Sequence, residues 1–327
     1  MSSNKPYWVG FDLGGTKMLA VVLDAKFRII ASERMKTKGN EGAETGMKRL
    51  TKAIVGALEK AGVAREQLGG IGGGCPGPLD LDAGVILHTP NLGWNNVPIK
   101  KILEKTFGCP VVIANDVDAG TYGEYRFGAA QGARCVLGVF PGTGIGGACI
   151  YEGNILRGRK GSCMEIGHFP IDPLGPVAAP GKWGTLESMT SRLAISAQAA
   201  QAVYRGQAPA LRELAGTKLE RIKSGVLAQA IREGDTVIED IVRHAARVLG
   251  TTVAGVINLL APDVLVLGGG LVEALPDLYV KEVRRVIRDK AMSAYVRELN
   301  VAAAKLGDDA GALGAAALAS EHTIGKS

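Results

Sequence analysis

Two glycine-rich turns, each between two short apolar runs, constrain the fold of this chain more than any other feature. The first turn covers residues 14–17 (Gly-Gly-Thr-Lys) and the second covers residues 142–147 (Gly-Thr-Gly-Ile-Gly-Gly). Apolar runs of this length predict strands, so each turn is expected to close a hairpin. Glycines leave the backbone N–H groups of a turn open to phosphate oxygens. Because Asn115 and Asp116 stand between the two turns in the sequence, we expect a cleft that holds a nucleotide beside an acid.

The same strand–turn–strand pattern occurs twice, which predicts a duplicated architecture. When Gly14 is set against Gly142, residues 18–23 and 146–151 fall roughly into register. Elsewhere, apolar spacing predicts helices over residues 42–61, 98–107 and 115–127, and mostly helical structure over 186–260. Further strands are expected at 69–75, 110–114 and 263–267, and a last helix from about residue 308. Residues 159–185 predict an irregular loop, and an irregular loop of that length usually has a function.

Composition limits the class of protein. A chain of 327 residues with 46% apolar and 21% charged residues is expected to form two lobes. The net charge of +6 comes without a block of five or more like charges, so a nucleic-acid surface is not expected. The five cysteines include no C-x-x-C pair, which argues against a disulfide framework and indicates a reducing cytoplasm.

No targeting or membrane segment is predicted. A strand-type run begins at Tyr7, which leaves no room for a signal peptide. The apolar stretch over residues 253–271 is interrupted by Asn258, Pro262 and Asp263, so a membrane span is not expected.

The motifs have structural explanations beside the chemical ones. Lys17 adds a point charge to the first turn, and Asp12 is placed to hold Mg²⁺ through water, but a tight hairpin with a solvated lysine explains the same residues. The second turn matches G-x-G-x-x-G, yet residues 148–151 predict a strand where the dinucleotide fingerprint requires a helix. A second phosphate-binding hairpin, with Thr143 donating a hydroxyl, is the remaining interpretation. Asn115-Asp116 could simply cap a helix, and Asp118 is a rival carboxylate.

Taken together, the motifs resemble the ROK family (repressor, open reading frame, kinase) over nearly the whole chain. The resemblance implies an α/β, two-lobed, actin-like ATPase (ribonuclease H-like) fold with duplicated β-sheet cores and a central cleft. It places residues 1–114 and 308–327 in a small lobe with the first phosphate turn and part of the sugar pocket. It places residues 115–307 in a large lobe with the catalytic aspartate, the second phosphate turn, the sugar loop and the adenosine site. The residues that carry the resemblance are Asp12 to Lys17, Asn115-Asp116, Gly142 to Gly147, Glu165 to His168 and Gly268 to Gly270.

The resemblance also implies a reaction and its residues. The expected activity is ATP-dependent phosphorylation of a hexose, with D-glucose giving glucose 6-phosphate in glycolysis and Asp116 acting as general base. The expected cofactors are ATP and Mg²⁺, with Asp12 holding the metal through water. The sugar-binding residues implied are Gly77, Asn91, Asn115, Asp116, Glu165, His168 and Glu187. The ATP-binding residues implied are Asp12, Gly14, Gly15, Thr16, Lys17, Gly142, Thr143, Gly144, Gly269 and Gly270, with residues 308–314 closing the ATP side.

Several alternatives stay open at this point. The acceptor could be fructose, mannose, allose, N-acetylmannosamine or N-acetylglucosamine, and polyphosphate could replace ATP as the donor. The chain could also be a non-catalytic sugar-binding protein. A sugar-sensing repressor is not expected, because the eleven residues before Asp12 leave no room for a winged helix-turn-helix. The expected partners are a hexose and ATP, with no nucleic acid and no membrane, in a cytoplasmic homodimer.

The chain departs from the family at its zinc site. Most ROK proteins bind a structural zinc through a histidine and three cysteines. Alignment from His168 places Ala178, Pro180 and Thr185 at the cysteine positions, so no zinc is expected. Structural zinc contributes about 10–16 kcal/mol in finger peptides, and each proline in the loop offsets only about 0.4–1 kcal/mol. Trp183 is therefore expected to pack against the loop and order it.

Overall fold

The chain divides into two compact units. The computed structural model describes residues 7–89, 92–159 and 161–324. The first unit is made of residues up to 132, residues 153–163 and residues from 308 onward, and the second is made of 133–152 and 164–307. Residues 115–132 therefore group with the first unit, whereas the sequence placed them in the large lobe. The reason is that their helix packs against the C-terminal helix, as described below.

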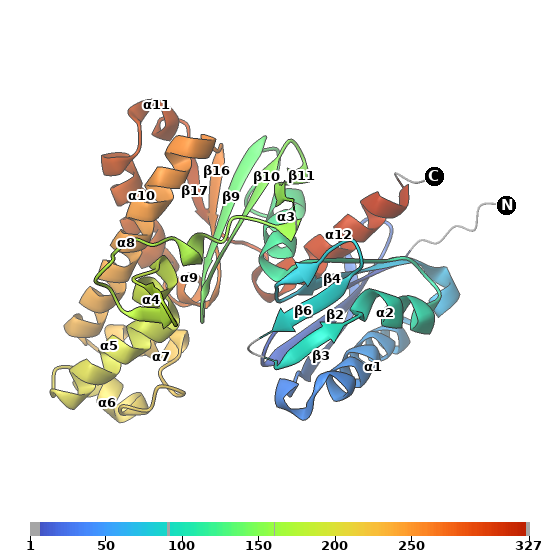
Figure 1. Cartoon of the computed structure of the whole chain (residues 1–327), viewed down its shortest axis with the longest axis horizontal. Helices are drawn as coiled ribbons and strands as arrows, with labels where there is room; N and C mark the ends of the chain where they lie inside the picture. The colour runs from blue at the N-terminus through green and yellow to red at the C-terminus, as the bar shows by residue number, and fades with distance from the viewer. Residues whose placement is uncertain (1–6, 90–91, 160, 325–327) are drawn as a thin grey trace. The chain divides into compact units, whose positions relative to one another are not determined.

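The first unit is built on a five-stranded sheet of order β3-β2-β1-β4-β8. Strands β1, β2 and β3 pair antiparallel, whereas β1–β4 and β4–β8 pair parallel. Helices α1 and α12 lie against this sheet in Figure 1. The strands and helices of this core are β1 (Tyr7–Leu13), β2 (Lys17–Leu23), β3 (Ile29–Lys36), α1 (Ala43–Ala61), β4 (Leu68–Cys75), α2 (Ile99–Phe107), β8 (Val111–Asn115), α3 (Asp116–Phe127) and α12 (Ala310–Ile324).

Helix α1 covers one face of this sheet because its apolar residues recur every three or four positions. Leu50, Ile54 and Leu58 are buried on it, together with Val9 and Phe11 from β1. The helix ends at a glycine, Gly62, in the left-handed conformation, which is the usual end of a helix.

Smaller elements complete the first unit. A three-stranded sheet, β5-β6-β7, follows β4, and a short hairpin joins β12 to β13. These elements are β5 (Leu79–Asp80), β6 (Val85–Thr89), β7 (Trp94–Val97), β11 (Asn154–Ile155), β12 (Arg157–Gly158), β13 (Gly161–Ser162) and the 3-10 helices η1 (Gly39–Glu41) and η2 (Arg65–Gln67). The predicted strands and helices of this unit are confirmed, but β5–β7 were not predicted.

Helix α12 approaches the other face of the sheet at glycines. A Cβ at Gly10 would lie 1.9 Å from the carbonyl oxygen of Ala312, and one at Gly72 would lie 1.8 Å from that of Ala315. The helix also meets α3 closely, because a Cβ at Gly314 would lie 1.9 Å from the carbonyl oxygen of Ala119. Backbone therefore packs directly on backbone, and this packing holds α3 in the first unit.

The second unit contains a sheet in which β10, β9, β16 and β17 are neighbours in that order. Its core joins this sheet to α8, α5, α7 and α10. Its elements are β9 (Cys135–Pro141), β10 (Ile145–Tyr151), η3 (Ile166–His168), β14 (Val177–Ala179), β15 (Lys182–Trp183), α4 (Leu186–Thr190), α5 (Arg192–Tyr204), α6 (Pro209–Ala215), α7 (Ser224–Arg232), α8 (Thr236–Leu260), β16 (Val264–Leu267), α9 (Gly270–Ala274), α10 (Pro276–Lys290), α11 (Ser293–Val296) and β17 (Asn300–Ala303), with η4 (Gly307–Asp309) leading out of it.

The predicted duplication is confirmed by the strand pairing. In the first unit an antiparallel hairpin, β1–β2, continues into parallel β4 and then parallel β8. In the second unit the hairpin β9–β10 continues into parallel β16 and then parallel β17. Each glycine-rich turn is the turn of such a hairpin, so the two turns occupy equivalent places in the two sheets.

Within residues 7–89, 92–159 and 161–324, none of the helices is both long enough and apolar enough to span a lipid bilayer.

The close approach of α12 leads to a test of stability. Gly72→Ala is expected to lower the free energy of unfolding by about 3 kcal/mol or more, because the new methyl group meets a backbone carbonyl that cannot rotate away. Gly56→Ala in α1, where a Cβ would meet Glu33 at an ordinary 3.4 Å, should instead be neutral or stabilise by up to about 1 kcal/mol. Urea denaturation of both variants checks the pair, and equal stability of the two would contradict the packing argument.

Candidate active site

Asp12 and Asp116 lie close together in the first unit. Asp12 is near the end of β1, where its strand neighbours are Leu19 on β2 and Gly74 on β4. A Cβ at Gly74 would lie 3.7 Å from Asp12 Oδ1 and 3.5 Å from the Cα atom of Asp116. Because Gly74 has no side chain, nothing on β4 separates the carboxylate of Asp12 from the start of α3.

The surroundings of Asp12 favour its protonated form. Burial, together with the negative charges of Asp116 and Asp308, raises the pKa of this carboxyl from 3.8 to about 7. The positive charges of Lys17 and Arg34 act in the opposite direction. Burial also raises the pKa of the Cys75 thiol, which lies near the same acids. Three carboxyl groups and two cations are therefore gathered at this end of the sheet.

Asn115 has the structural role that the sequence left open. It is the N-cap of α3, and its side-chain oxygen accepts hydrogen bonds from the N–H groups of Val117 at 2.9 Å and Asp118 at 3.3 Å. Its Nδ2 atom lies 3.6 Å from the position of a Cβ at Gly77. The structure thus brings together two of the residues predicted for the sugar pocket, while Asn91 lies outside the described residues.

The two acids of α3 differ in their environments. Asp116 is half-buried at the first position of the helix, and its Oδ1 accepts a hydrogen bond from the N–H of Val117 at 3.0 Å. Asp118 is fully buried, and its Oδ2 accepts a hydrogen bond from the hydroxyl of Ser162 on β13. Asp118 therefore connects α3 to the β12–β13 hairpin, and Asp116 is the more exposed carboxylate of the pair.

The first glycine turn carries a charge network that the sequence only partly predicted. The N–H of Gly14 donates to the carbonyl oxygen of Lys17 at 3.0 Å, which closes the turn. Lys17 Nζ donates to Asp308 at 2.7 Å, and Arg34 Nη1 from β3 reaches the same carboxylate at 2.6 Å. Lys17 and Arg34 hold the pKa of Asp308 below its usual range. Arg34 was not predicted, because nothing in its spacing along β3 separates it from a solvated strand residue.

The second glycine turn has a cation of its own. The N–H of Gly142 donates to the carbonyl oxygen of Gly144 at 2.8 Å. Arg192, at the start of α5, donates from Nη2 to the hydroxyl oxygen of Thr143 at 2.9 Å, and its backbone N–H donates to the carbonyl oxygen of Gly142 at 2.9 Å. Partial burial lowers the pKa of Arg192. Arg192 was missed because it stands fifty residues downstream in an ordinary helical sequence, with no motif around it.

Glu187 is bound to this second turn. It lies on α4, and its Oε2 accepts a hydrogen bond from the N–H of Ile145 at 2.8 Å. A Cβ at Gly144 would lie 2.3 Å from that oxygen, so a larger residue there would displace the carboxylate. Glu165 precedes the short helix η3 and His168 is its last residue, and both are exposed. The part of the sugar pocket predicted in this unit thus combines one acid that supports the turn with two accessible polar groups.

The loop between η3 and α4 is ordered by backbone hydrogen bonds. The carbonyl oxygen of Gly184 accepts from the N–H groups of Ile171 at 2.9 Å and Asp172 at 3.1 Å, and the N–H of Leu186 donates to the carbonyl oxygen of Phe169 at 2.9 Å. The hydroxyl of Thr185 caps α4. Thr185, which occupies a family cysteine position, therefore serves as a helix cap here.

Trp183 does not pack against this loop as expected. Its side chain is 54% exposed, and it contributes to the loop through strand β15, which pairs antiparallel with β14. The expectation failed because it assigned the ordering to an apolar side chain, whereas the peptide groups of the loop satisfy one another. Among the described residues, no group of three or more His, Cys, Asp or Glu side chains is placed to hold a metal ion.

Two of the glycines that follow β16 lie where a side chain would clash with neighbouring residues. A Cβ at Gly268 would lie 2.4 Å from the ring of Phe140, and Gly269 adopts a left-handed φ of 78° beside the carbonyl oxygen of Pro141. Gly270 begins α9. These contacts keep side chains away from the end of β9, next to the second turn.

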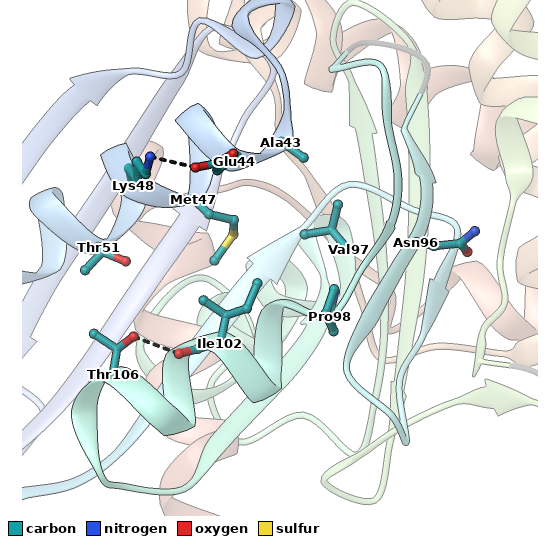
Figure 2. Close-up of a pocket in the computed structure, with 10 residues that line it drawn as sticks. All are labelled: Ala43, Glu44, Met47, Lys48, Thr51, Asn96, Val97, Pro98, Ile102 and Thr106. Carbon is teal, nitrogen blue, oxygen red and sulfur yellow. Dashed lines mark hydrogen bonds and ion pairs between the residues drawn. The ribbon is translucent and has the colours of Figure 1, made fainter.

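A hollow of about 560 Å³ lies between α1 and the segment that joins β7 to α2 (Figure 2). Met47, Val97 and Ile102 provide apolar surface, and Glu44, a lining carboxylate, is paired with Lys48 at 2.7 Å. It contains neither glycine turn and none of the predicted site residues, so it is separate from the predicted site.

A more polar hollow of about 400 Å³ adjoins the turn that contains Gly77. It is bounded by Leu79 and by residues of the β12–β13 hairpin. The carboxylates of Asp80 and Asp82 and the guanidinium groups of Arg157 and Arg159 line it. Groups of both signs offer donors and acceptors for hydroxyl groups, so this hollow suits a neutral polyhydroxylated molecule better than a polyanion.

The backbone network of the loop leads to one prediction. Gly184 has a φ of 54°, and a Cβ there would lie 1.5 Å from the carbonyl oxygen of Asp172. Gly184→Ala is therefore expected to speed amide hydrogen exchange at Ile171, Asp172 and Leu186 by at least about tenfold, because local opening becomes easier. Trp183→Ala should leave those rates unchanged, since the side chain is exposed. Faster exchange in the Trp183 variant alone would restore the original expectation.

The pKa of Asp12 leads to a second prediction, about pH. The folded protein holds a proton on Asp12 up to about pH 7, whereas the unfolded chain releases it near the ordinary value of 3.8. The contribution of protonated Asp12 to the free energy of unfolding is therefore fully present below pH 4 and is lost as the pH rises through 7. The stability of Asp12→Asn, which cannot ionise, should rise relative to that of the wild type by roughly 2–3 kcal/mol from pH 5 to pH 8. Urea denaturation without metal or nucleotide checks this, and a constant difference would contradict it.

Comparison with known proteins agrees with this architecture. The sequence pattern that describes the ROK family matches residues 8–322. A glucokinase from Halalkalibacterium halodurans is 32% identical over 316 residues, which cover 94% of this chain and 93% of that protein. A xylose repressor from Caldicellulosiruptor bescii is 28% identical over 310 residues, which cover 95% of this chain and 77% of that protein.

A solved structure extends the comparison to the fold. The crystal structure of a ROK family glucokinase from Streptomyces griseus, in complex with glucose and AMPPNP, matches with a TM-score of 0.83 at 33% identity. The match covers 95% of this chain and 98% of that one. The two sheets of equivalent topology and this likeness confirm the actin-like ATPase fold that the motifs predicted. This chain belongs to the ROK family.

Proposed function

We propose that this chain is an ATP-dependent hexose kinase, with D-glucose as the acceptor and glucose 6-phosphate as the product. Glucokinases are among the relatives about one-third identical over nearly the full chain, and the Streptomyces griseus enzyme was crystallised with glucose and AMPPNP. Repressors share the fold, so family membership alone does not separate a kinase from a sugar sensor. The choice between them rests on the acids of the first unit.

The observation that carries the proposal is the pair of Asp12 and Asp116, with only Gly74 between them on β4. A kinase needs one acid near the nucleotide's metal and a second acid near the acceptor hydroxyl. Asp116 starts α3 next to Asn115, whose amide lies beside Gly77, and these residues provide polar groups for a sugar. Asp12 lies beside the first glycine turn, where phosphates would bind.

In the proposed reaction, the 6-hydroxyl oxygen of glucose attacks the γ-phosphorus of ATP. The bond from the γ-phosphorus to the bridging oxygen breaks, and ADP leaves with that oxygen. The hydroxyl proton passes to the carboxylate of Asp116, so atoms and charge balance. General base catalysis of this kind contributes about 10²–10⁴-fold to the rate.

The residues also fit Mg²⁺, which kinases of this kind use with ATP. Mg²⁺ is usually held by one or two carboxylates together with phosphate oxygens and water. Burial and the charges of Asp116 and Asp308 raise the pKa of Asp12, and a bound cation would favour its ionised form. Asp12 would hold the ion through water, and the ion would neutralise charge on the phosphates.

The two glycine turns are proposed to bind the phosphates of ATP. Gly15 and Thr16 are exposed at the first turn, with Lys17 and Arg34 beside them. Thr143 is exposed at the second turn, and Arg192 donates to it. Each turn thus combines backbone donors with a guanidinium or ammonium group, a combination that suits phosphate oxygens.

Asp116→Asn is expected to lower kcat by about 10²–10⁴-fold while the Kd for glucose changes by less than about tenfold, because the amide keeps the shape and hydrogen-bonding capacity of the carboxylate. Steady-state kinetics and calorimetry check the two values. Asp118→Asn is the matched control, since it makes the same chemical change two residues away at a buried group, and its kcat should stay within about tenfold. Retained kcat in Asp116→Asn would contradict the assignment of the base.

The proposed substrate is tested by coupled measurement of ADP release with a panel of hexoses and N-acetylhexosamines. The highest kcat/KM is expected for glucose with ATP. A higher kcat/KM for another sugar or for polyphosphate would change the proposed substrate, while the assignment as a kinase would stand. Sugar binding without turnover of any panel member would reject the kinase and favour a sugar-binding protein.

A further inference from the structure

A small hollow at the edge of the second unit has an arginine-rich wall. It measures about 170 Å³ and lies between the last turns of α10, the segment after α11, and β17, which is the outermost strand of its sheet. Three of its lining residues are arginines, Arg284, Arg288 and Arg297. None of the residues that line it is an aspartate or a glutamate.

The three arginines converge from two elements. Arg284 and Arg288 are four residues apart on α10, so their side chains lie on the same face of the helix. Arg284 Nη2 donates a hydrogen bond to the carbonyl oxygen of Val301 on β17 at 2.6 Å. That bond fixes one guanidinium group at the rim and leaves its other N–H groups available. Arg297 reaches the hollow from the segment that follows α11.

Nearby arginines that serve the fold have acidic partners. Glu282, also on α10, is bonded to Arg243 at 2.8 Å, Arg247 at 3.1 Å and Arg285 at 3.3 Å. By contrast, within residues 7–89, 92–159 and 161–324, no ion pair joins Arg288 or Arg297 to an acid. Glu282 thus neutralises the arginines around it, whereas no carboxylate lines the hollow.

The end of the helix explains only part of this cluster. Positive side chains in the last turn of a helix interact favourably with its dipole, and Arg288 lies in the last turn of α10. Arg284 lies one turn earlier and Arg297 lies outside the helix, so the dipole does not account for them. Three like charges around one hollow repel one another unless an anion lies between them.

We propose that this hollow binds a phosphate group, either free or carried by a small metabolite. Arginine guanidinium groups match phosphate oxygens in pairs. Ile287 and Val301, which are 1% and 3% exposed, line the hollow with apolar surface, which strengthens charged hydrogen bonds by excluding water.

The size of the hollow agrees with a single phosphate group. A volume of 170 Å³ holds roughly six water molecules at about 30 Å³ each, and pockets for whole small molecules measure about 300–1,000 Å³. The phosphate therefore enters and the remainder of a metabolite stays outside. None of the residues proposed for the sugar or for ATP lines this hollow, so the inference does not depend on the proposed kinase activity.

Calorimetric titration of the full chain with inorganic phosphate at constant ionic strength tests the site. The test variant is Arg288→Gln with Arg297→Gln, which leaves the hydrogen bond of Arg284 intact. Arg205→Gln with Arg232→Gln is the matched control, because it removes two exposed arginines of the same unit that have no ion pair among the described residues. Phosphate should bind the wild type and the control equally, and the test variant at least about tenfold more weakly.

Hydrogen exchange locates the binding, since the glycine turns can also take phosphate. Phosphate should slow exchange in residues 284–301 of the wild type and the control, but not of the test variant. Arg288→Lys with Arg297→Lys should show intermediate protection, because lysine keeps the charge and loses the paired geometry. Unchanged exchange in residues 284–301 of the wild type, or equal protection in the test variant, would overturn the proposal.

A second titration distinguishes the two sources of the group. Equal affinity for inorganic phosphate and glucose 6-phosphate in this segment would assign the site to the phosphate group alone. Tighter binding of glucose 6-phosphate would assign it to a phosphorylated sugar.

Discussion

The candidate site of the first unit depends on the missing side chains of Gly10, Gly72 and Gly314. Carbonyl oxygens of α12 lie less than 2 Å from the positions that Cβ atoms at Gly10 and Gly72 would occupy. A carbonyl oxygen of α3 likewise lies less than 2 Å from the position of a Cβ at Gly314. The C-terminal helix can therefore rest on the sheet and on α3 at backbone distance. This contact brings the segment before α12, with Asp308, next to Asp12 and Lys17, although nearly three hundred residues separate them in the sequence.

The consequence is an electrostatic balance that neither end of the chain could form alone. Asp12 is surrounded by two further acids and by two cations, and burial determines the outcome by favouring its neutral form. Asp308, more exposed, stays ionised because Lys17 and Arg34 bind it. Two carboxyl groups of the same type thus differ in protonation near neutral pH, and the difference arises from packing rather than from residue type.

Local chemistry explains what could be predicted from the sequence. Strands and helices with clear periodicity, such as those at residues 7–13 and 43–61, were predicted correctly because their patterns are local. The hairpin duplication was visible because each glycine turn is flanked by apolar runs. Arg34 and Arg192 could not be found, since each becomes part of a turn only through folding. The grouping of residues 115–132 with the first unit depended on contacts with α12 that no local pattern encodes.

The expectation that Trp183 orders the loop between η3 and α4 was wrong for a related reason. Residue types can show that cysteines are absent from positions 178, 180 and 185, but they cannot show which peptide groups pair instead. The expectation for Trp183 assigned to one large side chain what a set of backbone hydrogen bonds performs. Of the residues predicted for the sugar, Asn115 and Gly77 lie side by side in the first unit.

The means by which this loop is ordered affects how the protein responds to its surroundings. A loop clamped by thiolates and a metal ion depends on zinc supply, on chelators and on the oxidation state of its sulfur atoms. The loop that follows His168 is held by the carbonyl oxygen of Gly184, by the paired strands β14 and β15, and by the hydroxyl of Thr185. Chelators do not extract peptide and hydroxyl groups, and peroxide does not oxidise them, so these particular hydrogen bonds do not themselves depend on a metal ion or on the oxidation state of sulfur.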